Sequence, residues 1–133
     1  MPALIHRFHN AKVNGLDTVD IWGDGTPLRE FLYVDDLARA CLTLLRDYDE
    51  ADAINIGSGQ EISIKNLAIM ISEVIGFSGQ ITFNKERPNG TPRKLLDSSH
   101  ISNLGWSAQV NLEDGISSTY NWFLENHEKG SSL

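Results

Sequence analysis

The 133-residue sequence has one cysteine and four scattered histidines, so it has little of the chemistry that builds disulfides or metal sites. A single thiol, that of Cys41, cannot form a disulfide within the chain. The histidines fall at positions 6, 9, 100 and 127, without the close spacing of zinc ligands. We therefore expect no metal site, and we expect Cys41 to be a small buried side chain in an apolar helix.

Long hydrophobic runs are also missing. No stretch approaches the roughly 20 apolar residues that cross a bilayer, so we expect no membrane segment. The first 12 residues carry His6, Arg7 and His9 and lack the apolar centre of a secretory signal. The expected location is therefore the cytoplasm.

Positive charge is scarce overall. The 11 lysines and arginines are outnumbered by 18 acidic residues, which gives a net charge of −7 and argues against nucleic acid as a partner. Four of the basic residues nevertheless fall within ten positions: Lys85, Arg87, Arg93 and Lys94. Such a cluster in an acidic chain is typical of a site for a small anion, and exposed solubilising charge is the alternative.

The spacing of apolar residues predicts a mixture of helices and strands, hence an α/β (α+β) fold. We expect helices over residues 2–14, 35–45, 64–75, 98–105 and 111–126. Strands are expected over residues 18–22, 30–34, 53–56 and 80–83, with a further extended piece at 95–96. Residues 1–126 are expected to form one domain, and residues 127–133 a flexible tail.

Two glycine pairs could suggest a dinucleotide-binding loop. Gly23 and Gly25 follow a strand but precede a second strand, and Gly57 and Gly59 lack a third glycine at the required spacing. Both pairs indicate plain turns, so we predict no cofactor-binding residue in this chain. The adjacent Asp35–Asp36 indicates a helix start rather than a catalytic pair, and no catalytic residue is predicted.

A more informative set combines cations with an aromatic ring. Trp22 ends a strand, and Arg29 follows the glycine turn after it. Arg7 lies on the first helix, and residues 87–94 form a proline-rich loop with cations at both ends. A flat ring and separated guanidinium groups suit a nucleoside diphosphate. Independent surface charges explain the same spacing about equally well.

Residues 22–38 resemble a segment shared by extended short-chain dehydrogenases/reductases. The segment reads WGDGTPLREFLYVDDLA and is similar to the pattern G-x-G-x-x-x-R-x-F-x-x-V-x-D. Many epimerases and dehydratases that act on sugar nucleotides share this pattern. The resemblance therefore implies the superfamily and leaves the substrate open.

Three other segments resemble a narrower family, the GDP-L-fucose synthases. They are PALIHRFH at residues 2–9, NGTPRKLLD at 89–97 and STYNWFLEN at 118–126. The resemblance implies that residues 1–126 are the C-terminal, substrate-binding part of an NADPH-dependent enzyme. That enzyme epimerises GDP-4-keto-6-deoxymannose at two carbons and then reduces it to GDP-L-fucose.

The same resemblance implies which residues contact the GDP portion of the substrate. They are Arg7, Trp22, Arg29 and Lys94. Asn89 stands where the family usually has a substrate-contacting aspartate. An amide can still donate and accept hydrogen bonds but carries no charge, so the contact at Asn89 is a departure from the family pattern.

The family's cofactor loop and catalytic groups have no counterpart in the sequence, so the resemblance implies that an N-terminal Rossmann domain is missing. None of the three tyrosines has a lysine four positions later, and the family's catalytic histidine would fall just before Met1. We expect the chain alone to bind GDP, to bind no NADPH, to be inactive, and to form a homo-oligomer through exposed apolar surface. Two alternatives stay open: part of an enzyme for a UDP- or dTDP-sugar, and a stand-alone binding or assembly module.

Overall fold

The computed structural model describes residues 1–127 and contains two small sheets surrounded by helices. In the first sheet, β1 (Thr18–Trp22) pairs in parallel with β4 (Gln80–Asn84). The second sheet has the strand order β3 (Glu61–Ser63), β2 (Leu28–Glu30), β5 (Arg93–Lys94). The central strand β2 runs antiparallel to β3 and parallel to β5. This mixture confirms the α/β class expected from the sequence.

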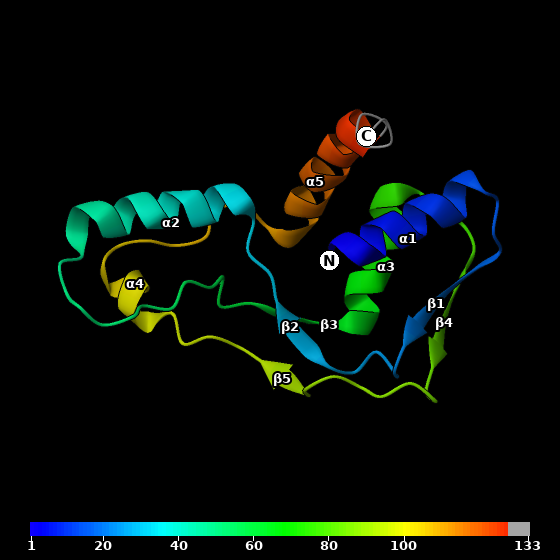
Figure 1. The fold of residues 1–133 in the computed structure, drawn as a ribbon, viewed down its shortest axis with the longest axis horizontal. Helices are drawn as coiled ribbons and strands as arrows, with labels where there is room; N and C mark the ends of the chain where they lie inside the picture. The colour runs from blue at the N-terminus through cyan, green and yellow to red at the C-terminus, as the bar shows by residue number, and fades with distance from the viewer. Residues whose placement is uncertain (128–133) are drawn as a thin grey trace.

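Five helices lie in two groups on either side of the three-stranded sheet (Figure 1). One group contains α1 (Pro2–Val13), α3 (Ile64–Ile75) and α5 (Leu112–His127), near the β1–β4 sheet. The other contains α2 (Val34–Asp47) and the short α4 (Ser99–Asn103). Each group encloses its own apolar cluster.

The larger cluster joins α1, α3 and α5 to β1. Phe8, Leu67, Ile71 and Ile116 are completely buried in it. Burying one such side chain contributes roughly 1.5–3 kcal/mol relative to leaving it in water. This cluster therefore fixes α1 and β1, the two elements that carry Arg7 and Trp22.

Helix ends follow the capping residues read from the sequence. The Ser63 hydroxyl accepts a 3.1 Å hydrogen bond from the amide of Asn66 at the start of α3. Gly76 ends that helix in the left-handed region, at φ 72°. The Asn111 side-chain oxygen likewise accepts a 2.9 Å bond from Asp114 at the start of α5. These local signals explain why the expected helix positions are confirmed.

The short strands differ from the expectation. The second strand covers Leu28–Glu30 rather than residues 30–34, and Tyr33 is the N-cap residue of α2. No strand forms at residues 53–56, where Ile54 and Ile56 pack against the smaller apolar cluster instead. The partners of β2 are residues 61–63 and 93–94, because strand pairing depends on distant segments that local periodicity does not reveal.

The expectation that Cys41 is buried is wrong. Helix α2 buries Asp36 and Ala40, which are four residues apart and share one face. Cys41 follows Ala40 and is turned away from that face, so its thiol is exposed. Leu42 and Leu45 are also exposed, at 67% and 83%. The apolar surface of α2 is thus largely uncovered in this chain.

Asp36 connects α2 to the segment that leads into α5. Its carboxylate is fully buried and accepts 2.9 Å hydrogen bonds from the backbone amides of Gln109 and Val110. It also forms an ion pair with Arg39. Burial raises the pKa of Asp36, but these hydrogen bonds and the Arg39 charge outweigh burial and hold that pKa below its ordinary value.

Helix α5 ends at His127. The flexible tail expected for residues 127–133 falls almost wholly outside the described residues and stays a prediction.

Replacing Asp36 with asparagine is expected to lower the free energy of unfolding by about 3 kcal/mol, measured by urea denaturation. The asparagine amide keeps one acceptor oxygen but carries no charge. Its NH₂ group would face one of the two backbone N–H donors, and two donors cannot form a hydrogen bond. The neighbouring Asp35→Asn is the matched control, because Asp35 is exposed. Since the folded pKa is depressed, the wild-type advantage is present above the ordinary Asp pKa and is lost as pH falls through the folded pKa. Equal stability of both variants at pH 7 would contradict this role.

Candidate nucleotide-binding site

The turn after β1 is fastened to the loop at residues 85–92. Gly23 and Gly25 both have positive φ, at 83° and 79°, which favours glycine. The Asn89 side-chain oxygen accepts a 2.9 Å hydrogen bond from the amide of Asp24. A Cβ on Gly23 would collide with that same oxygen, so Gly23 is required for this approach. Asn89 therefore holds the loop against the end of β1.

The Asp24 carboxylate stabilises the same turn. It accepts bonds of 2.9 and 2.7 Å from the amide and hydroxyl of Thr26. Together with the Asn89 side chain, these bonds lower the pKa of Asp24 to about 2. The carboxylate is therefore ionised throughout the physiological range and is a poor candidate for an acid–base catalyst.

Trp22 presents an exposed ring beside this turn. Its exposed fraction is 61%, which is unusual for so large an apolar side chain. The guanidinium carbon of Arg87 lies 5.1 Å from the ring centroid, within the range of a cation–π contact. The loop thus supplies a cation next to the ring.

Arg29 and Lys94 are register partners on the parallel strands β2 and β5. The Arg29 guanidinium donates a 2.6 Å bond to the carbonyl of Leu28. Its Nη2 lies 2.9 Å from where a Cβ on Gly90 would be, so it sits directly against the loop. The exposed Lys94 ammonium makes no hydrogen bond or ion pair with any residue in the described part of the chain.

Arg7 lines a pocket of about 900 Å³ between α1, β1 and α5. Its guanidinium donates a 2.7 Å bond to the carbonyl of Asp20 on β1. Trp22, together with Trp122 and Phe123 of α5, also lines this pocket. Most of the wall is apolar, while His6 and Asn10 add groups that can form hydrogen bonds.

The five residues expected to bind a nucleotide therefore lie along one continuous surface. The pocket contains Arg7 and Trp22, Asn89 touches the turn after Trp22, and the loop that holds Asn89 abuts Arg29, which is paired with Lys94. The sequence did not single out Trp122, His6 or Asn10. For His6 and Asn10 a signal was present in α1, because residues 3, 6, 7 and 10 share a helical face, whereas Trp122 lies on α5 and depends on a contact between distant helices.

Five of the six arginines separate into two groups by partner, and the sixth, Arg87, lies over the Trp22 ring. Arg39, Arg46 and Arg93 form ion pairs with Asp36, Asp47 and Glu61. Arg7 and Arg29 donate only to backbone carbonyls in the bonds that they form within residues 1–127. In a chain with a net charge of −7, cations without a carboxylate partner mark places where an external anion is favoured.

Neither glycine pair has the geometry of a dinucleotide loop. Strand β2, not a helix, follows Gly25, and β3 lies between Gly59 and the next helix. The Glu30 carboxylate accepts a 2.6 Å bond from the Gly59 amide, so an acceptor already occupies that position. A pyrophosphate there would meet a negative charge. These two turns do not fit the phosphates of NADPH.

Within residues 1–127, no group of three or more His, Cys, Asp or Glu side chains is arranged to hold a metal ion. None of the helices in that range is long and apolar enough to span a membrane.

Comparison with known proteins identifies relatives of this chain. Residues 1–57 match the NAD dependent epimerase/dehydratase family. GDP-L-fucose synthase 1 of Arabidopsis thaliana is 55% identical over 126 residues, which is 95% of this chain and 39% of that protein. The chain spans about 40% of the length of the curated relatives it matches.

Solved structures share the fold. A GDP-L-fucose synthetase from Naegleria fowleri bound to NADP superposes with a TM-score of 0.90 at 32% identity, covering 96% of this chain and 40% of that one. A GDP-mannoheptose C4 reductase from Campylobacter jejuni with NADP bound gives 0.83 at 37% identity, covering 92% and 44%.

The change Asn89→Asp is expected to raise the pKa of Asp24 from about 2 toward the ordinary value of 3.8. A second carboxylate beside the Asp24 amide disfavours the ionised form of its neighbour and removes the amide's support. Titration of the carboxyl ¹³C resonances by NMR measures this shift. Asn89→Ser is the control without the added charge, and an Asp24 pKa that is the same in both variants would contradict the repulsion.

Proposed function

Because this chain is homologous to GDP-L-fucose synthases over 126 residues, we propose that it is the C-terminal, substrate-binding part of such an enzyme and holds the GDP portion of the substrate. The observation that carries the proposal is the pair of cations Arg29 and Lys94, which have no carboxylate partner within residues 1–127 and are joined through the Asn89–Gly90 loop to the turn after the exposed Trp22. A nucleoside diphosphate has a flat base, which suits the Trp22 ring, and a charged diphosphate, which suits Arg29 and Lys94.

The nucleoside end fits the pocket between α1, β1 and α5. Its volume of about 900 Å³ lies within the range of small-molecule sites. Trp22 offers a face for stacking, and its apolar neighbours exclude water from a base. His6 and Asn10, whose side chains are hydrogen-bonded to each other at 3.2 Å, add polar atoms to the same pocket. Arg7 lines the same pocket and adds a positive charge for the ribose or the first phosphate.

The diphosphate end fits Arg29 and Lys94. A guanidinium presents paired donors that match phosphate oxygens, and an ammonium adds a point charge. Strand pairing places both residues at the same level of adjacent strands. The loop at residues 85–92 adds Arg87, which already lies over the Trp22 ring. One flat end at Trp22 and one charged end at Arg29 and Lys94 thus match the two parts of the ligand.

In the whole enzyme, binding of the nucleotide by these residues assists a reaction that takes place at the sugar. Epimerisation of GDP-4-keto-6-deoxymannose at two carbons needs an acid and a base at the sugar, and reduction needs the nicotinamide of NADPH held against it. Binding of the remote nucleotide orients the sugar for those steps. We place NADPH and the catalytic groups in an N-terminal Rossmann domain outside this chain, and we place the protein in the cytoplasm.

The proposal is tested by titrating the purified chain with GDP in a calorimeter. Arg29→Ala and Lys94→Ala are each expected to weaken GDP binding roughly tenfold or more, because each removes a charge-assisted hydrogen bond. Arg46→Ala is the matched control, because Arg46 already pairs with Asp47 and should leave the affinity unchanged. Equal affinity for all four proteins would remove Arg29 and Lys94 from the site.

The same titration separates the alternatives. Tighter binding of UDP or dTDP than of GDP would favour an enzyme for another sugar nucleotide, and no binding of any nucleotide would favour an assembly module. Substantial turnover of NADPH with the keto-sugar nucleotide by the isolated chain would contradict the location proposed for the catalytic groups.

A second copy of the chain is the proposed partner of helix α2. Four large apolar side chains of α2 are exposed: Val34, Leu37, Leu42 and Leu45. We expect light scattering to give the mass of a dimer or a larger assembly, and Leu45→Lys to shift it toward a monomer. Leu124→Lys on α5 is the control, because Leu124 is another exposed leucine. A monomeric wild-type chain at high concentration would contradict this expectation.

A further inference from the structure

Lys94 lies on strand β5, which is too short to be fixed by its own strand pairing. Strand β5 has two residues and lies at the edge of its sheet. It is paired with β2 only through Leu28 with Arg93 and Arg29 with Lys94, together with a 2.9 Å bond from the Leu28 amide to the carbonyl of Pro92. A lysine side chain is long and flexible, so the position of its ammonium depends on what fixes the backbone beneath it.

One fixed point lies immediately before Lys94. The Arg93 Nε donates bonds of 2.9 and 2.8 Å to the two carboxylate oxygens of Glu61, and its Nη2 lies 2.6 Å from Oε2. Glu61 belongs to β3, on the far side of β2 from β5. The ion pair therefore spans the central strand and ties the two outer strands together. The Glu61 side chain is only 13% exposed, whereas the Arg93 side chain is 63% exposed.

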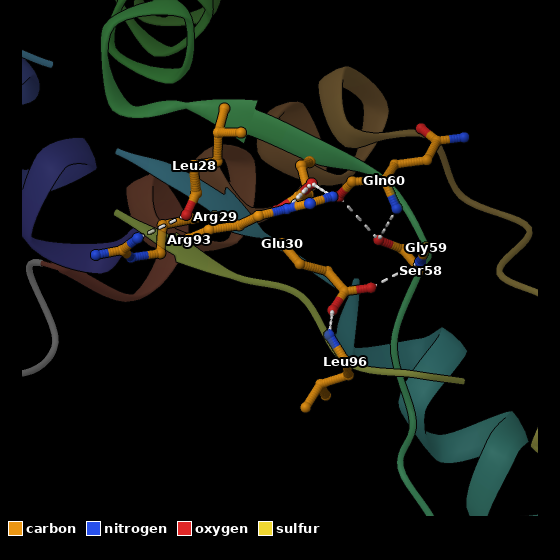
Figure 2. A network of polar contacts seen from close by, with 9 residues as sticks. Leu28, Arg29, Glu30, Ser58, Gly59, Gln60, Arg93 and Leu96 are labelled. Atoms are coloured by element: carbon orange, nitrogen blue, oxygen red, sulfur yellow. Dashed lines mark hydrogen bonds and ion pairs between the residues drawn. The ribbon is translucent and has the colours of Figure 1, made fainter. Parts of the chain in front are cut away.

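A second fixed point lies two residues after Lys94. The Glu30 carboxylate accepts a 3.2 Å bond from the Leu96 amide and a 2.6 Å bond from the Gly59 amide. Figure 2 shows this carboxylate between the loop at Gly59 and the backbone at Leu96. A side chain on Gly57 would collide with Glu30, so the loop is shaped around it. Glu30 belongs to β2 and follows Arg29 directly.

We propose that Glu61 and Glu30 are positioning residues that bracket Lys94 and hold its strand beside Arg29, without touching the nucleotide. This inference rests on the proposed function, in which Lys94 contacts the diphosphate. Two carboxylates near a diphosphate would ordinarily repel it. Here the Glu61 charge is matched by Arg93, and the Glu30 charge is directed at two backbone amides. They fix the site without opposing its ligand.

The arrangement also gives Arg93 a different role from its neighbours in the basic cluster. Its guanidinium is already engaged by both oxygens of Glu61, and the pKa of that carboxyl is lowered by the hydrogen bonds and charge of Arg93. Arg93 belongs to the support of the site, whereas Lys94 faces solvent with no partner among residues 1–127.

The test is a double-mutant cycle on GDP affinity, measured by calorimetry on the 133-residue chain. Glu61→Gln is expected to weaken GDP binding about fivefold in the wild-type background and to have little further effect in the Lys94→Ala background. Arg93→Gln breaks the same ion pair from its exposed end and should reproduce this pattern. Glu61→Asp retains the charge and should recover part of the loss.

The outcomes separate this inference from the proposed function. If Arg29→Ala and Lys94→Ala both leave GDP affinity unchanged, the proposed function is overturned, and this inference with it. If Lys94→Ala alone leaves it unchanged, only this inference is overturned. If Lys94→Ala weakens binding but Glu61→Gln and Arg93→Gln do not, only the positioning role is overturned. A full loss from Arg93→Gln in the Lys94→Ala background would show that Arg93 contacts GDP directly. If Glu61→Gln unfolds the chain, as circular dichroism would show, Arg93→Gln alone decides the result.

Discussion

Strand β2 is the element on which the rest of the site depends. It is three residues long, yet it pairs with β3 on one side and β5 on the other. Arg29 and Glu30 are consecutive on it, so their side chains lie on opposite faces of the sheet. One of these residues is proposed to bind the nucleotide, and the other to hold the neighbouring strand. Loss of β2 pairing would therefore disturb both the proposed nucleotide contact of Arg29 and the contact by which Glu30 holds β5.

Charge is distributed unevenly around this strand. The chain has seven more acidic than basic residues, but the Glu61 carboxylate is paired with Arg93, and the Glu30 carboxylate accepts bonds from two backbone amides. Within residues 1–127, Arg29 and Lys94 have no carboxylate partner, and the diphosphate is proposed to lie beside them. An overall acidic protein can thus keep a local site for an anion, because interactions of exposed charges fade beyond about 10 Å in salt solution.

The helices were predictable from local signals, and the small sheet was not. Ser63, Gly76 and Asn111 mark helix ends through bonds to residues at most five positions away. Strands β3 and β5 contain three and two residues and are defined by pairing with β2, at separations of more than thirty residues. No periodicity can be recognised in segments so short.

The candidate site was predictable in part, for similar reasons. Trp22 and Arg29 stood out because they flank a glycine turn, and the resemblance to a family added Arg7, Asn89 and Lys94. The roles of Glu30 and Glu61 could not be read from the sequence, since each depends on a contact across the sheet. The same limit explains why Cys41 was expected to be buried although its thiol is exposed. Helical spacing shows that apolar residues share a face but does not show whether anything covers that face.

In the proposed complex, a nucleoside diphosphate extends from the pocket at Trp22 to the cations on β2 and β5. The most direct measurement compares guanosine with GDP by NMR, following the indole resonance of Trp22 and the side-chain resonances of Arg29 and Lys94. Guanosine should shift Trp22 alone, and GDP should shift all three. Shifts confined to α2 and α4, or the same shifts at Arg29 and Lys94 with guanosine as with GDP, would contradict the account.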